Sequence, residues 1–472
     1  MSAAIIYHYN DFYPLKSLAG DLQDWPPPQP GERILVFAPH PDDETVGVGG
    51  YLVAAAKAGA DIHVVTVTSG DAFRAGVDYW YHTLSPSAAL FRRYGTLRAS
   101  EARAAVQTLG IPVSHLTFLG FPDEGTAHLW LDYWSPGRLY TSPYTQADRV
   151  PYDFAYRPNL PYTAPDELAA VKSVLAKYRP QLLLTLQPND VHPDHWATGT
   201  FVTLALQELR NDGDAWANQT TVLRYIVHRG EWPLPKGYHP TLPLLPPPGL
   251  RGLGFPWYRF PVSPEEATRQ EQAILHYRTQ VSLMREFLLS FARANTLFAI
   301  DPTPTVPEQA TLSATGLDQH WDHDPASLWD PQSDTLLRDI GGSGDLRWLY
   351  LVENRRDLIF RLRVRDLLPA KTLVYRLRFY LISHAAGQDQ VIPLRLDLMP
   401  GAEPRLFNLS TNKELALKIP LVYHGHELQS ALPLSLGQGA RQVMVGVSVR
   451  QRGHLIDRSA YRLFQLSAPA GT

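Results

Sequence analysis

Two short segments of the chain gather histidine and carboxylate side chains around a proline. The first is 38–44 (APHPDDE) and the second is 189–195 (NDVHPDH). Two imidazoles and one carboxylate can hold a divalent metal ion as a tripod that leaves a position for water, as catalytic zinc sites do. A remaining carboxylate can act as base toward that water, and a remaining imidazole can help to stabilise an oxyanion. The residue types therefore predict a metal-dependent hydrolase.

Cysteine is absent from all 472 residues. This excludes disulfide bonds, a thiolate nucleophile and cysteine-ligated zinc. A metal site in this chain must use histidine and carboxylate ligands, which are the residues that the two segments supply.

Apolar runs alternate with helical patterns through the first half of the chain. The runs that predict buried strands are 33–38, 61–68, 115–119, 181–186 and 221–228. The helices expected between them are 45–58, 97–109, one beginning at Thr163, and 195–209. This alternation indicates right-handed crossovers and a Rossmann-like α/β fold, with a mainly parallel sheet flanked by helices. Each His-rich segment follows a strand directly, so it lies at a carboxyl end, where open α/β sheets place their ligand sites.

Two further stretches complete this first domain, which we expect to span residues 31–300. Residues 121–162 are rich in Trp, Tyr, Pro and Gly and predict loops. The run Ser263 to Glu266 is a helix start, and we expect one helix to continue from it. Its apolar stripe is interpreted as core packing and comprises Ile274, Tyr277, Val281, Met284, Leu288 and Phe291.

The last third of the chain changes its period from helical to two. In 357–367 (DLIFRLRVRDL), for example, Leu358, Phe360 and Leu362 alternate with other residues. Several such strands predict an all-β sandwich over 330–472. We expect a proline-rich lead-in over 1–30 and a linker over 301–329 before it. The motif in 330–340 (DPQSDTLLRDI) resembles sugar-binding sandwiches, so carbohydrate binding and a packing or dimerisation role are both candidates for this domain.

Composition limits the classes of partner and the cellular settings that we expect for this protein. The net charge is −3 and there is no long basic run, which argues against a dedicated nucleic-acid binder. No apolar run reaches the length of a membrane helix. The first residues lack the basic start and long apolar stretch of a signal peptide, but a processed export signal would leave no trace, so the compartment stays open.

The paired motifs resemble those of the PIG-L/LmbE-like N-deacetylase family, which includes the N-acetylglucosaminyl-phosphatidylinositol and mycothiol-pathway deacetylases. The resemblance is carried by 40–44 (HPDDE), 68–71 (TSGD) and 192–195 (HPDH) and extends over about residues 31–300. Arg98, Glu101 and the segment ending near Gly110 are also similar to that family's second helix.

The resemblance implies a role for each residue of the two segments. His40, Asp43 and His195 match the family's zinc ligands, with another divalent metal such as Fe²⁺ as an alternative. Asp42 matches the general base, and His192 matches the histidine that assists the tetrahedral intermediate. Asp194 would orient His192 or tune its charge.

One position departs from the mycothiol-type pattern. A tyrosine stands two residues before the position of His192 in those enzymes, whereas this chain has Asp190. The identity of the proton donor is therefore left open.

Four further residues are candidates for binding substrate. Asp71 and Asp123 follow strand ends, Arg98 offers a guanidinium to sugar hydroxyls or a phosphate, and His228 ends the run 221–228. Their structural alternatives are a loop cap, a turn residue, a surface ion pair and a core histidine, respectively.

The function expected from the residues and the resemblance is zinc-dependent hydrolysis of an N-acetyl group, with release of acetate. The substrate would be a small molecule or glycoconjugate of the N-acetylglucosamine type, which the resemblance alone implies. Two alternatives remain: an amidase acting on another small N-acyl metabolite, and a non-catalytic carbohydrate-binding envelope protein.

Overall fold

The computed structural model describes residues 22–251, 253–314, 326–331, 342–366, 372–385, 388–437 and 439–467. These residues fall into two compact units. Unit 1 comprises the chain up to Trp130 together with Leu139–Ala205 and Ala215–Asp301. Unit 2 comprises Leu131–Arg138, Leu206–Asp214 and the chain from Pro302 onward. Each unit is described by itself below.

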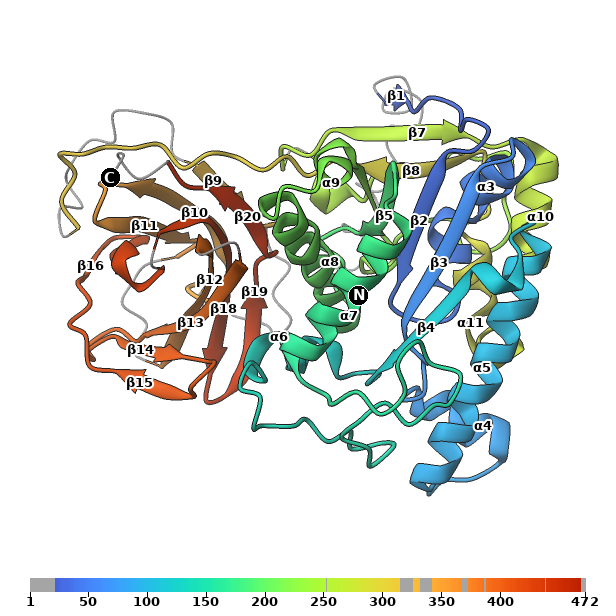
Figure 1. The fold of residues 1–472 in the computed structure, drawn as a ribbon, viewed down its shortest axis with the longest axis horizontal. Helices are drawn as coiled ribbons and strands as arrows, with labels where there is room; N and C mark the ends of the chain where they lie inside the picture. Colours follow the sequence, from blue (N-terminus) through green and yellow to red (C-terminus); the bar gives the residue numbers. More distant parts are fainter. Residues whose placement is uncertain are drawn as a thin grey trace, which may run out of the picture. The chain divides into compact units, whose positions relative to one another are not determined.

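Unit 1 is built on an eight-stranded mixed sheet (Figure 1). Its strands are β1 (Gln23–Asp24), β2 (Arg33–Ala38), β3 (Asp61–Thr68), β4 (Leu116–Phe121), β5 (Leu182–Leu186), β6 (Thr221–Tyr225), β7 (Trp257–Pro261) and β8 (Asn295–Ala299). The spatial order is β1-β7-β8-β6-β5-β2-β3-β4. The five strands from β6 to β4 are all parallel, as expected. The remaining part of the sheet, where β8 pairs antiparallel with both β6 and β7, was not predicted from the sequence.

The sheet of unit 1 lies between two groups of helices, with α3, α5 and α10 on one face and α7 and α8 on the other (Figure 1). The helices are α3 (Asp43–Lys57), α4 (Arg74–Tyr81), α5 (Ala88–Thr108), α6 (Thr126–Asp132), α7 (Ala164–Tyr178), α8 (Pro193–Asn211), α9 (Ala215–Gln219), α10 (Pro264–Ile274) and α11 (Arg278–Leu289). Two short 3₁₀ turns, Val113–His115 and Pro248–Leu250, also occur. Right-handed crossovers explain the grouping, because β2-β3-β4 and β5-β6 advance in opposite directions across the sheet. Helix α6 lies within the region for which only loops were expected.

The central strands are hydrophobic because both of their faces are covered. In β2, every residue from Ile34 to Ala38 is at most 1% exposed. The five residues of β5 are likewise buried. A Val, Leu or Ile buried in this way contributes about 1.5–3 kcal/mol to folding. This core fixes the strand ends, and with them the two His-rich turns.

The helix expected to continue from Ser263 is in fact two helices. Its start is as predicted: the Ser263 hydroxyl accepts from Glu266 N, and the Glu266 carboxylate accepts from Ser263 N. However, α10 ends at Ile274 and α11 begins at Arg278. At this break the Glu101 carboxylate accepts from both Thr279 N and the Thr279 hydroxyl, at 3.0 and 2.6 Å. A side-chain partner far away in sequence thus replaces a bond of the helical ladder, which periodicity could not reveal.

Unit 2 contains antiparallel sheets. One sheet has the order β16-β17-β11-β10-β9, and the other has the order β15-β14-β13-β12-β18-β19, with β20 also paired to β18. The strands are β9 (Ala326–Trp329), β10 (Leu346–Glu353), β11 (Asp357–Val364), β12 (Leu373–Ala385), β13 (Gln388–Leu398), β14 (Arg405–Asn408), β15 (Lys413–Leu415), β16 (Leu421–His424), β17 (Glu427–Pro433), β18 (Ala440–Gln451), β19 (His454–Arg458) and β20 (Arg462–Gln465). A 3₁₀ turn spans Leu434–Gly437.

The period-two pattern in unit 2 has the predicted meaning. Leu358, Phe360, Leu362 and Val364 of β11 are at most 1% exposed and belong to one hydrophobic core. The expected linker over 301–329 is corrected in part, because Ala326–Trp329 form a strand and 302–314 belong to unit 2. Hydrogen bonding to β10 draws β9 into the sheet. Residues 1–21 of the lead-in, 315–325 of the linker and 332–340 of the sugar-binding resemblance lie outside the described residues.

Within the described ranges, no helix combines the length and the apolar character needed to cross a bilayer.

Candidate active site

The two His-rich segments lie side by side at the carboxyl edge of the sheet. Strands β2 and β5 are parallel neighbours, and 38–44 follows β2 while 187–195 follows β5. The connections from these two strands leave toward opposite faces, so they form the topological switch point of the sheet. Helix α3 begins at Asp43 and α8 begins at Pro193, which sets both turns at helix N-termini.

Three side-chain atoms from these turns converge on one point. His40 Nδ1 lies 3.0 Å from Asp43 Oδ2, and His195 Nε2 lies 3.2 Å from both of these atoms. All three side chains are buried, with His195 wholly so. The sequence reading named these three residues as the metal tripod, and the structure brings them together as a nearly equilateral triangle.

The triangle fits a zinc ion in its donor set and its dimensions. Zinc bonds of about 2.0–2.1 Å in tetrahedral geometry separate neighbouring ligand atoms by about 3.3–3.4 Å. The three observed separations are slightly shorter than this. Two imidazoles and one carboxylate are also the ligand types of catalytic zinc sites, which keep one position for water.

Asp190 holds His195 in the orientation that a ligand needs. Its carboxylate lies 3.1 Å from His195 Nδ1 and accepts from the backbone N–H groups of His192, Val227 and His228, each at 3.0 Å. Burial opposes charge on both partners, yet their attraction lowers the pKa of Asp190 and raises the pKa of His195 to about 9. The proton on Nδ1 leaves the Nε2 lone pair for a metal, an arrangement common around zinc-bound histidines. Asp190, which departs from the family's tyrosine, is thus a positioning residue and not an exposed proton donor.

Asp42 lies next to the triangle in an unusual conformation. It is 6% exposed, and its φ of 139° is in a region that non-glycine residues rarely adopt. Arg98 Nη2 lies 3.2 Å from Asp42 Oδ2. Burial raises the pKa of Asp42 to about 7, although the Arg98 charge opposes this rise.

Arg98 was expected to bind substrate, but the structure places it behind Asp42. It is 3% exposed, donates to the main-chain carbonyls of Gly70 and Pro41 at 3.0 and 2.7 Å, and forms an ion pair with Asp42. Gly70 permits this approach, because a Cβ there would lie 2.0 Å from Arg98 Nη1. A guanidinium with these partners fixes the carboxylate of Asp42 and has little left to offer a sugar.

The second nitrogen of His40 faces two further carboxylates. His40 Nε2 lies 3.1 Å from Asp123 Oδ1 and 3.3 Å from Asp194 Oδ2. The Asp194 carboxylate also accepts from the backbone of Glu124 and Thr126, at 2.7 and 3.1 Å. The expected pairing of this carboxylate with His192 is therefore corrected: Asp194 supports His40, because its side chain points toward the turn after β4.

His192 contacts the two ligand histidines by its ring. Its centroid lies 4.7 Å from that of His40 and 4.8 Å from that of His195. Asp194 N donates to His192 Nδ1 at 3.3 Å, so a neutral ring carries its proton on Nε2. Burial and the neighbouring histidines lower the pKa of His192. The geometry thus provides a neutral N–H donor at Nε2, 3.8 Å from Glu124 Oε1.

Asp71 and His228 differ in their position relative to the cavity at the tripod. The Asp71 carboxylate accepts from the Tyr152 hydroxyl, and burial raises its pKa to about 7. It is not among the residues that line the cavity at the tripod. His228 does line this cavity, with its ring centroid 4.8 Å from that of His195 and 5.3 Å from that of Phe287.

A cavity of about 270 Å³ opens over the tripod. Most predicted residues line it, but so do groups that the sequence reading did not select, notably Glu124 and Phe287. Glu124 has a φ of 58° and follows Asp123, so the acidic pair after β4 was the only signal for it. No tyrosine is found among the described residues that line this cavity.

A second group of one aspartate and two histidines occurs in unit 1, at Asp61, His63 and His115. Their rings differ from those of the tripod, because His63 and His115 stack at 4.0 Å with an angle of 15°. Stacked rings direct their in-plane lone pairs along parallel planes and not toward one point. Asp61 is also exposed, so this group is a weaker metal site than the tripod.

Comparison with known proteins agrees with the motifs. The sequence profile of the PIG-L family, described as GlcNAc-PI de-N-acetylase, matches residues 35–206. Residues 35–206 are a PIG-L family domain. This PIG-L domain contains both His-rich turns, whereas His228 and α11 follow it in the chain.

Curated relatives match part of this chain. They carry the name 1D-myo-inositol 2-acetamido-2-deoxy-alpha-D-glucopyranoside deacetylase. The protein from Kineococcus radiotolerans is 32% identical over 193 residues, which are 39% of this chain and 47% of that protein. The protein from Mycobacterium sp. (strain KMS) is 30% identical over 208 residues, which are 44% of this chain and 53% of that protein. The chain thus spans about half the length of the relatives it matches.

Solved structures match at lower similarity. The N,N'-diacetylchitobiose deacetylase of Pyrococcus horikoshii is 15% identical, with 64% of this chain and 92% of that chain covered and a TM-score of 0.35.

Proposed function

We propose that this protein is a zinc-dependent hydrolase that removes the N-acetyl group from an N-acetylglucosamine-type sugar or glycoconjugate and releases acetate. The observation that carries the proposal is the triangle of His40 Nδ1, Asp43 Oδ2 and His195 Nε2, with the buried carboxylate of Asp42 beside it. A tripod without a neighbouring base would suit a structural or storage site equally well.

The residues that would hold the metal are His40, Asp43 and His195. When bound, a zinc ion polarises a carbonyl oxygen and lowers the pKa of its water. Fe²⁺ is an alternative for the same donor set. Asp190, Asp123 and Asp194 orient the two imidazoles from outside, and their hydrogen bonds favour the tautomers in which the inner nitrogens are lone pairs.

Asp42 is assigned as the general base. Its carboxylate accepts a proton from the attacking water as the oxygen of that water bonds to the acyl carbon. Arg98 keeps Asp42 in place, so that the side chain loses little freedom when the proton moves. The low exposure of Asp42 keeps bulk water from competing for this proton.

His192 is assigned to the carbonyl oxygen. Its Nε2–H donates to the oxygen on which negative charge develops, and the neutral ring is sufficient for this role. The C–N bond then breaks, and the leaving amine takes the proton that Asp42 accepted. The products are acetate and a free amine, so the atoms of amide and water are balanced.

The name of the curated relatives supports the proposal that the substrate is an N-acetylglucosamine-type sugar. Their name describes a 2-acetamido-2-deoxy sugar, and the PIG-L profile match over residues 35–206 includes both His-rich turns. An amidase acting on another N-acyl metabolite would use the same residues, and a substrate panel scored by acetate release separates the two.

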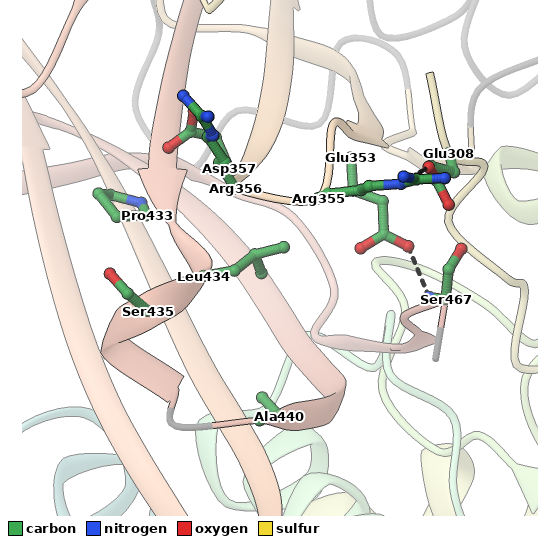
Figure 2. A pocket seen from close by; sticks show the side chains of 11 residues that line it. Glu308, Glu353, Arg355, Arg356, Asp357, Pro433, Leu434, Ser435, Ala440 and Ser467 are labelled. Atoms are coloured by element: carbon green, nitrogen blue, oxygen red, sulfur yellow. Dashed lines mark hydrogen bonds and ion pairs between the residues drawn. The ribbon is translucent and has the colours of Figure 1, made fainter. Parts of the chain in front are cut away.

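For unit 2 we infer a β-sandwich, in line with the sequence expectation. Support comes from its hydrophobic core, to which both sheets contribute, including the contact of Phe360 with Phe379 at 5.5 Å between ring centroids. Unit 2 also has a cavity of about 690 Å³ lined by Glu308, Glu353, Arg355, Arg356 and Asp357 among others (Figure 2). None of the lining residues is aromatic, so this cavity offers no ring on which a sugar could stack. It therefore gives little support to the alternative of a carbohydrate-binding protein without activity.

Metal analysis combined with acetate release tests the proposal on the wild type and Asp42→Asn. We expect about one divalent ion per chain in both proteins. Turnover of the variant should fall by about 10²–10⁴-fold, because base catalysis contributes that much. Asp148→Asn is a matched control, since the Asp148 side chain is half exposed. Equal turnover in wild type and Asp42→Asn would refute the base, and a metal-free wild type after reconstitution with zinc would refute the hydrolase.

A further inference from the structure

The cavity over the tripod has a polar side and an apolar side. The groups that can bond to hydroxyls include Asp123 and Glu124 after β4, His192 after β5 and Gln280 of α11. The apolar side is made by Val227 after β6 and by Met284, Phe287 and Leu288 of α11, and is called the apolar wall below.

The apolar wall adjoins the metal ligands. His228 connects the two, because its ring lies 4.8 Å from the ring of His195 and 5.3 Å from the ring of Phe287. An acyl carbon placed beside Asp42 and the tripod is therefore within one side chain of this wall.

The helix that builds the wall is irregular at the cavity. Met284 has φ −129° and ψ 25°, outside the helical range, within α11. Met284, Phe287 and Leu288 are spaced i, i+3 and i+4, so they share the face of α11 that lines the cavity, whereas Leu283 is 41% exposed.

A sugar ring is poorly suited to the apolar wall. Its hydroxyls would lose water without gaining partners, which costs about 1–3 kcal/mol for each group. Stacking on Phe287 is also restricted, because that ring already has His228 stacked at 5.3 Å and Lys236 Nζ 4.8 Å from its centroid. A hydrocarbon chain needs no hydrogen-bond partners and gains free energy from this contact.

We propose that the apolar wall holds the acyl group of the substrate while the polar side holds the sugar, so that the preferred substrates are N-acyl glucosamines with chains longer than acetyl. This inference rests on the proposed hydrolase function and deepens it by naming the acyl class. An acetyl methyl is too small to cover a wall made of four side chains, and a chain of four to eight carbons covers more of it.

The test is the hydrolysis of N-acetyl-, N-butanoyl-, N-hexanoyl- and N-octanoylglucosamine, measured by release of the free amine. We expect kcat/KM to rise from acetyl to hexanoyl by at least tenfold, since each buried methylene is worth up to about fourfold. In Met284→Gln, which has nearly the same size, this rise should fall to about threefold or less. Leu283→Gln is the matched control on the exposed side of α11 and should keep the wild-type rise.

The outcomes separate this inference from the function on which it rests. If no member of the series is hydrolysed by the zinc-loaded wild type, the hydrolase function fails, and the acyl preference with it. If acetylglucosamine is hydrolysed best, the function stands and the acyl preference is refuted. A chain-length rise that Met284→Gln retains in full would also refute the role of the wall.

Discussion

Two cavities of this protein, one in each unit, show that the larger volume does not coincide with the catalytic chemistry. The cavity of unit 2 measures about 690 Å³ and that of unit 1 about 270 Å³. In unit 2 the charged groups are of two kinds: Arg355 pairs with Glu308 while 65% of its side chain is exposed, and the buried Glu353 accepts from Ser467 N. In unit 1 the charged groups are buried, and the ligand atoms of the tripod converge on one point.

The difference has an energetic origin. A charge removed from water costs several kcal/mol unless partners compensate it, so a protein rarely collects buried carboxylates and imidazoles without a use for them. Asp190, Asp194 and His195 are all 0% exposed. The smaller cavity is therefore the functional candidate, and changes in the two cavities should have effects of very different size.

The largest effect is expected for His195→Ala. Removing one ligand of three should abolish zinc binding, and activity should fall by about 10³-fold or more because no water is activated. Zinc content after gel filtration and acetate release measure the two effects. His63→Ala is the control in the stacked group of Asp61, His63 and His115, and it should retain the wild-type zinc content. If His195→Ala retained one zinc per chain, the tripod would be wrong.

An intermediate effect is expected for Asp190→Asn. The amide of asparagine cannot accept as strongly from His195 Nδ1, so the imidazole loses orientation and basicity. Zinc affinity should fall by about 10–100-fold, as observed when outer carboxylates are removed from zinc sites. Competition with a chelator measures the affinity, with Asp148→Asn as control. At saturating zinc, kcat should recover most of its wild-type value; an unchanged affinity would contradict the positioning role.

The smallest effect is expected for Glu353→Gln in the unit 2 cavity (Figure 2). Glu353 is 3% exposed, and burial raises its pKa above the ordinary value of a glutamate. The unfolded chain therefore ionises first as pH rises, so the wild type loses stability from about pH 4.5 up to the folded pKa. The glutamine variant lacks this loss and should be more stable at pH 8, by on the order of 1 kcal/mol, but not at pH 4.

Urea unfolding at pH 4 and pH 8 measures this difference, and turnover should equal that of the wild type. A loss of turnover in Glu353→Gln would mean that the unit 2 cavity takes part in catalysis, which would reverse the comparison of the two cavities.

Much of unit 1 followed from local pattern. Continuous apolar runs predicted β2, β3 and β5, because strands buried on both faces have no polar side. The same runs located the two His-rich turns, because a segment that directly follows a parallel strand lies at the carboxyl edge. Strands β7 and β8 were missed because Arg259 interrupts the apolar residues of β7 and because the apolar run 297–300 (LFAI) is too short to distinguish a strand from a buried helix segment.

The residues around the tripod were harder to predict than the tripod. Arg98 was predicted to bind substrate and Asp194 to act on His192, but their side chains point elsewhere: Arg98 to Asp42, and Asp194 to His40. Glu124 and Phe287 enter the cavity from elements that are distant in sequence. The direction of a side chain depends on tertiary packing, which the spacing of residues along the sequence does not reveal.

The sequence alone determined which chemistry is available, because residue type and spacing within 40–43 and 190–195 define a set of histidine and carboxylate ligands. Tertiary structure decided how that chemistry is arranged. Only the pairing of β2 with β5 brings His40 and His195, which are 155 residues apart, to 3.2 Å. The fold also explains why Asp190 stands where the mycothiol-type enzymes have a tyrosine. Its carboxylate is the partner of His195, and backbone N–H groups of the turn after β6 hold it in place.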